Sequence, residues 1–175
     1  MSISMHSSSA PLFVRSLTAM LTWLDKAEES AKARGFDPEI LLTHRLAPDM
    51  FPFVRQVQVA TDSAKNCVAR LSGAEPPTWE DNEDSTDALR ERIQKTIDYV
   101  ESISASDIDG SETREILMPA GPDRTLKFEG EAFLTGFSIP NFYFHAAMAY
   151  ALLREAGVDL GKMDFLGAMD MQVEE

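Results

Sequence analysis

Apolar residues recur every three or four positions in three long segments of the chain, which predicts three amphipathic helices. The first helix follows "HSSSAP", where Ser8 or Ser9 is the expected cap, and it ends near Gly35. The second helix is expected to begin around Asp49, which would serve as its N-cap. This spacing is typical of helices that cross at a shallow angle, as in a bundle.

The third helix shows the clearest separation of an apolar and a charged face. It begins at Asp84 or Ser85, and its charged residues, Arg92 among them, are expected to face solvent. The stretch before it, "SGAEPPTWEDNEDS", contains two prolines and five acidic residues. That composition predicts a long polar loop between the second and third helices.

The period of the pattern changes after the third helix. The runs "TREILMP" and "RTLKFEG" alternate in polarity around the turn "AGPD", which predicts a small β-hairpin that ends at Gly130. A short helix around Phe133 follows, and a last long helix is expected from Pro140 to near Gly157. The predicted fold is therefore mainly α: an up-down four-helix bundle with a β-hairpin before the last helix.

The two ends of the chain carry weaker signals than its centre. Phe165 and Leu166 lie between glycines and are expected to anchor the tail on the bundle. Residues 1–10 and 168–175 are expected to fray, and residues 1–175 are expected to form a single domain.

The chain has 175 residues, of which 44% are hydrophobic and 26% charged, as in ordinary globular proteins. Its formal net charge of −13 argues against nucleic acid and anionic membrane surfaces as partners, because both require a basic protein face. Cys67 is the only cysteine, so no internal disulfide forms, and the start of the chain does not resemble a signal peptide. We therefore expect a cytoplasmic protein.

The last helix is the most apolar part of the sequence. Residues 132–153 contain no formal charge, but Gly136, Pro140 and His145 interrupt them, so we expect a buried, broken helix and not a membrane span. The consecutive residues 142–144 are all aromatic and point about 100° apart on a helix, so one side cannot bury all three. The hairpin, the tail or a second subunit must cover the rest, and we predict a homodimer.

Three segments of the sequence, "RLAPDMFPF", "IPNFYFH" and "GKMDFLG", together resemble those of a bacterial and fungal family of unknown function. That family lies within the DinB/YfiT-like four-helix-bundle superfamily, and the resemblance extends from about Leu12 to Gly167. It implies an up-down bundle with one long crossover that often pairs into dimers. Superfamily relatives often bind a divalent metal through three histidines, and some are thiol-dependent transferases.

The superfamily metal pattern transfers poorly to this chain. It requires one histidine on the second helix and an H-x-x-x-H pair on the fourth. His145 matches the first member of that pair, but Ala149 stands at the second position. The nearest histidine to the second helix is His44, in the preceding connector. Loss of the i, i+4 pair removes the two ligands that one helix face would supply.

His145 therefore has two interpretations. It is either a buried residue bonded to a backbone carbonyl or to a neighbour such as Asn141, with which it would share a pocket, or a metal ligand. A reduced metal site would combine His145 with His44 and Asp49, although capping already accounts for Asp49. No cofactor is expected, and zinc or nickel is the alternative.

Three further candidates are weaker. Glu129 and Glu131 are acidic residues near the start of the fourth helix, but both are expected to face water. Cys67 lies on a mostly apolar helix face and is expected to be a buried, inert thiol.

Two functions remain open from the sequence. The first is a dimeric binding or structural module whose metal site is incomplete and which has room for a small-molecule ligand. The second is a metal-assisted, thiol-dependent transferase or hydrolase that acts on a small electrophile. An enzyme of that kind needs about three protein ligands around an open metal, and only one matched position is present.

Overall fold

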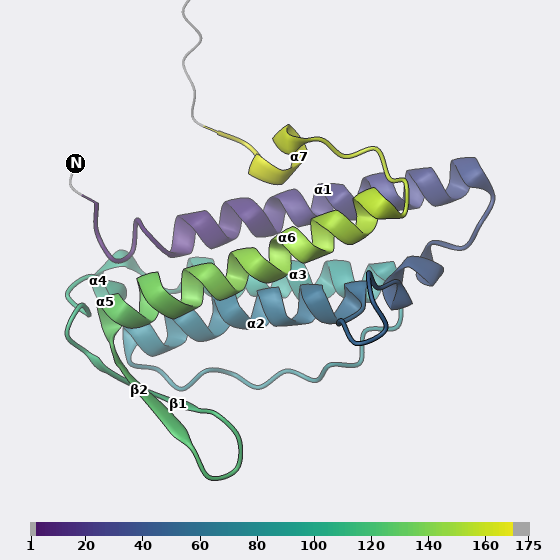
Figure 1. The fold of residues 1–175 in the computed structure, drawn as a ribbon. Helices are drawn as coiled ribbons and strands as arrows, with labels where there is room; N and C mark the ends of the chain where they lie inside the picture. The colour runs from purple at the N-terminus through teal and green to yellow at the C-terminus, as the bar shows by residue number, and fades with distance from the viewer. Residues whose placement is uncertain (1–2, 170–175) are drawn as a thin grey trace, which may run out of the picture.

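The computed structural model describes residues 3–169, and four long helices form its body (Figure 1). They are α1 (Ala10–Arg34), α2 (Phe53–Ser72), α3 (Thr86–Ser102) and α6 (Ile139–Glu155). The predicted mainly helical bundle is confirmed. Within residues 3–169, no helix is both long enough and apolar enough to cross a membrane.

Helices α2 and α3 run in the same direction, because the segment between them returns along the whole bundle (Figure 1). We call this segment, residues 73–85, the crossover segment. The two helices contact each other near their centres, where Arg92 of α3 donates a hydrogen bond to Thr61 of α2. Helix α6 runs against α2, since Gln56 bonds to His145 whereas Ser63, further along α2, bonds to Asn141.

Residues at the helix termini determine where each long helix begins and ends. The residue after α1 is Gly35 and the residue after α2 is Gly73, and both adopt the left-handed conformation that ends a helix. The Ser85 side chain accepts a hydrogen bond from Ala88 N at the start of α3. Asp49 is not an N-cap: it lies in an exposed turn, and α2 begins at Phe53 because Pro52 disfavours the helical conformation of the residue before it.

Shorter elements connect the long helices. The predicted hairpin is present as β1 (Glu115–Pro119) and β2 (Thr125–Glu129), which pair with Ile116 opposite Phe128. The others are η1 (Pro38–Thr43), α4 (Ala105–Ile108), α5 (Gly130–Phe133), η2 (Leu134–Ser138) and α7 (Lys162–Leu166). Figure 1 shows the hairpin projecting from one end of the bundle.

Gly130 joins the hairpin to α5 where two backbone segments nearly touch. A Cβ atom at this position would lie 2.0 Å from the carbonyl oxygen of Ser111. Only glycine permits this approach, and it fixes how the hairpin leaves the bundle. Helices α5, η2 and α6 then follow one another without a break, so Pro140 lies in the first turn of α6 and interrupts nothing.

The ends of the described chain pack more firmly than expected. Met5 is only 6% exposed, and the main-chain amide of His6 donates a hydrogen bond of 2.8 Å to Asp109 Oδ1, so the segment before α1 packs on the bundle from Met5 onward, although Ile3 is exposed. In the tail, Phe165 stacks on Trp23 at 5.8 Å, which confirms the expected anchor. The fraying expected for residues 170–175 lies outside the described residues.

Candidate functional site

His145 is buried, with 8% of its surface exposed, and Gln56 is its hydrogen-bond partner. The two side chains join His145 Nδ1 to Gln56 Oε1 at 2.7 Å. Gln56 Nε2 in turn donates to the carbonyl oxygen of Phe51 at 3.2 Å. A carbonyl oxygen only accepts, so this second bond orients the amide and makes His145 Nδ1 the donor. The neutral imidazole then keeps its lone pair on Nε2.

Gln56 was not among the candidate site residues from the sequence, although its position on a helix could have identified it as a buried polar residue. It lies on the buried face of α2, three residues after Phe53 and four before Ala60. An amide on an otherwise apolar helix face needs a buried polar partner. Asn141, the partner expected for His145, instead donates to Ser63 Oγ at 2.7 Å.

Burial lowers the pKa of His145 below its ordinary value, and the positive charge of Arg55 lowers that pKa further. Both effects favour the neutral imidazole. A positive charge that disfavours imidazolium also disfavours a divalent cation at the same place.

Two exposed aromatic rings flank His145. Phe51 stacks on the imidazole at 6.5 Å, and Phe144 meets it edge to face at 5.1 Å. Phe51 is 51% exposed and Phe144 is 56% exposed. The Arg55 guanidinium lies 5.8 Å from the centre of the Phe51 ring. We call Phe51, Phe144 and the edge of His145 the aromatic patch.

His44 is not near His145. Its Nε2 hydrogen-bonds to the carboxylate of Glu155, the last residue of α6. Glu155 lies ten residues after His145, which is about 15 Å along the helix. The structure therefore does not bring His44, Asp49 and His145 together as one site.

The remaining candidates lie in separate places. Asn141 lines a hollow of about 240 Å³ between α2, β1 and the start of α6, but His145 does not line it. Glu129 and Glu131 are exposed, as expected. Cys67 is fully buried, and burial raises the pKa of its thiol to about 12, although a hydrogen bond with Ser138 lowers that pKa slightly.

The donor set does not fit the three-histidine metal site that the resemblance implies. Within residues 3–169, no group of three or more His, Cys, Asp or Glu side chains lies close enough together to hold a metal ion. His145 Nε2 has the right chemistry for one ligand, but α2 supplies an amide, Gln56, which bonds to Nδ1, and Ala149 stands at the position of the second histidine.

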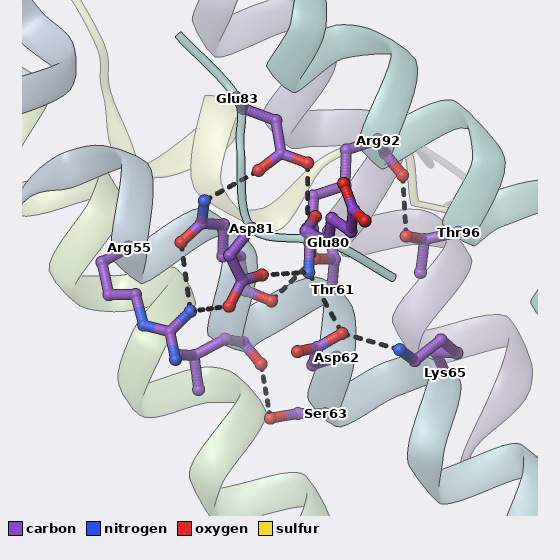
Figure 2. A network of polar contacts seen from close by, with 12 residues as sticks. Arg55, Thr61, Asp62, Ser63, Lys65, Glu80, Asp81, Glu83, Arg92 and Thr96 are labelled. Carbon is purple, nitrogen blue, oxygen red and sulfur yellow. Dashed lines mark hydrogen bonds and ion pairs between the residues drawn. The ribbon is translucent and has the colours of Figure 1, made fainter. Parts of the chain in front are cut away.

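A second polar cluster lies beneath the crossover segment (Figure 2). Arg92 was expected to face solvent, but it is 4% exposed. Its guanidinium reaches Asp62 at 3.1 Å, Asp81 at 3.0 Å and Glu83 at 2.9 Å. It also donates to Thr61 Oγ1 at 2.8 Å. We call these five residues the Arg92 network.

The Arg92 network attaches the crossover segment to α2 and α3. Asp81 and Glu83 belong to the crossover segment, Asp62 to α2 and Arg92 to α3. Trp79, in the same segment, lies between the ammonium groups of Lys65 and Lys95 at 4.5 and 4.6 Å from its ring centre. Each buried charge has a charged or hydrogen-bonding partner, so the cluster is explained by a structural role, namely attachment of the crossover segment to the bundle.

Comparison with known proteins identifies a family and a similar solved structure. The family described as "Domain of unknown function (DUF1993)" matches residues 5–166. The crystal structure of a DinB family member protein from Shewanella denitrificans superposes with a TM-score of 0.89 at 37% sequence identity. That match covers 97% of this chain and 95% of the Shewanella chain. No curated protein matches this chain significantly.

Proposed function

This chain belongs to the DUF1993 family, within the DinB-like superfamily, and we propose that it is a dimeric binding or structural module whose superfamily metal site is incomplete. The observation that carries the proposal is the bond between His145 and Gln56. It gives the one matched histidine a structural partner at Nδ1, which a buried imidazole needs.

The aromatic patch supports the dimer. Of the three consecutive aromatic residues in α6, Phe142 is fully buried in the core and packs on Phe13 at 4.9 Å. Tyr143 reaches Ser16 of α1 at 3.4 Å. Phe144 is 56% exposed, and the similarly exposed Phe51 contacts the same imidazole, that of His145. Exposed aromatic rings that lie close together on a protein surface are typical of interfaces between subunits.

Metal content tests the first half of the proposal. Protein purified without a histidine tag should contain far less than one equivalent of zinc or nickel. His145→Ala should leave that content unchanged while lowering the free energy of unfolding by about 1–3 kcal/mol, since it orphans the Gln56 amide. One metal ion per chain that His145→Ala removes would contradict the proposal and favour the metal-assisted transferase or hydrolase.

Molar mass tests the second half. We expect a dimer in light scattering at micromolar concentration, and we expect Phe144→Ser to shift it toward the monomer. Leu117→Ser is the matched control, because Leu117 is 54% exposed on the hairpin, away from the patch. A monomeric wild type, or equal effects of both substitutions, would contradict the proposed interface.

A cytoplasmic location completes the proposal. The single cysteine is buried and unpaired, and the described helices supply no membrane span. A protein built this way needs no oxidising compartment.

A further inference from the structure

An open groove lies between the first half of α1 and the C-terminal end of α3. Its volume is about 590 Å³, within the range of small-molecule sites. Its walls are mostly apolar, and we define this α1–α3 groove by Ala10, Val14, Arg15, Thr18, Ile103 and Ala168. It shares no residue with the aromatic patch or the Arg92 network.

Arg15 is the polar feature that the fold does not explain. Its Nε is buried and has no hydrogen-bond partner among residues 3–169. Nor does any carboxylate in the described chain form an ion pair with its guanidinium. A buried donor without a partner is costly, and such groups usually indicate a missing ligand or water.

The tail holds the stem of Arg15 in place. Gly167 lies so close to α1 that a Cβ atom there would be 3.3 Å from the Arg15 carbonyl oxygen and 3.4 Å from Arg15 Cγ. Packing against the methylene stem limits its rotamers and keeps the guanidinium at the groove. A preorganised cation loses little entropy when it binds an anion.

The lining of the groove carries one arginine and one carboxylate, so it has no excess of negative charge, although the whole chain carries −13. Arg15 and His6 line it, and Glu101 is the one carboxylate residue among its described lining residues. The first turn of α1, at Ala10 and Pro11, also borders the groove and adds the positive end of a helix dipole. The combination is an apolar trough beside one cation.

We propose that the α1–α3 groove binds an amphipathic monocarboxylate, with its alkyl or aryl chain on Val14 and Ile103 and its carboxylate on Arg15. Arginine suits this role because its planar guanidinium pairs with both oxygens of a carboxylate. The proposal goes beyond the dimeric module and is independent of its metal content. A single cation beside an apolar groove fits one small anion better than a nucleic acid or a lipid surface, which both need several cations.

Calorimetric titration of the full chain with octanoate, and with 1-octanol as the uncharged analogue, tests the proposal. We expect octanoate to bind and 1-octanol to bind about 10- to 100-fold more weakly, which is the value of one charge-assisted hydrogen-bonded pair. Arg15→Met should abolish the preference for the carboxylate. The matched control is Arg124→Met, which removes an exposed arginine on the hairpin and should change nothing.

Thr18→Phe provides a second variant that does not depend on removing Arg15. Thr18 is exposed at the groove, so the larger ring obstructs the groove beside Arg15 without changing charge or core packing. It should abolish octanoate binding. Absence of octanoate binding to the wild type, equal affinity for 1-octanol, or an equal loss in Arg124→Met would overturn the proposal. Dissociation of a dimer by Thr18→Phe would also overturn the proposal, because it would mean that a second copy of the chain occupies the groove. Phe144→Ser tests the aromatic patch as an interface separately.

Discussion

Replacing Arg92 by methionine should destabilise the bundle more than any other single change of charge that the structure suggests. The substitution keeps most of the side-chain volume but removes the guanidinium that three carboxylates share. It also leaves Thr61 Oγ1 and the carbonyl oxygen of Glu80 without their donor. The crossover segment then loses its main attachment to α3.

The magnitude follows from how exposed each partner is. Removing one member of a buried ion pair typically costs 3–5 kcal/mol. Asp62 and Asp81 remain roughly one-third exposed, so water rehydrates them and reduces the cost. Glu83 is nearly buried and cannot recover in this way. We therefore expect Arg92→Met to lower the free energy of unfolding by about 3 kcal/mol.

Urea denaturation followed by circular dichroism measures this change, because urea, unlike guanidinium, does not screen charges. The control is Lys127→Met, which removes an exposed ion pair with Glu115 on the hairpin and should cost less than about 1 kcal/mol. A double-mutant cycle with Glu83→Gln isolates the direct coupling. Equal losses for Arg92→Met and Lys127→Met would refute the reasoning.

Four further outcomes are expected. Because folding lowers the pKa of His145, the unfolded chain binds more protons as pH falls through about 6.5. Urea titrations should therefore show that the wild type loses more stability than His145→Gln between about pH 7.5 and pH 5.5. Cys67, with a thiol pKa of about 12, should react with a thiol reagent at neutral pH only as fast as the protein opens, and fully in urea. Gly130→Ala should lower the free energy of unfolding by about 1–3 kcal/mol or more, because the added Cβ would clash with the carbonyl oxygen of Ser111. Thermal denaturation measures this loss. Phe165→Ala should destabilise the tail, seen as faster amide exchange around Trp23 with little change in α2.

The long helices were predictable because their period is local. Gly35 marks the end of α1 and Ser85 the start of α3, and each acts through its own backbone or side chain. The start of α2 was less predictable, because Asp49 and Pro52 both resemble helix starts, and only the turn before Phe53 decides between them.

The interior polar contacts were not predictable from periodicity alone. Arg92 occupies a position on α3 that would face solvent if the crossover segment left the bundle, so its burial depends on where a distant loop returns. His145 could be recognised as buried from its uncharged surroundings, but its partner required knowing which turn of α2 lies opposite α6. Gln56 becomes identifiable only when that register is known.

The parallel arrangement of α2 and α3 sets a minimum length for the chain between them. Helix α3 has 17 residues and is about 26 Å long, so the connection must run back over that length before α3 begins. The crossover segment, thirteen residues from 73 to 85, spans at most about 43–47 Å when extended. Insertions here are compatible with the same helix order, whereas deletion of more than about four or five residues is not. In a relative with a shorter connection, α3 would have to run antiparallel to α2, and Leu89 and Val100 would then exchange places at the two ends of the core.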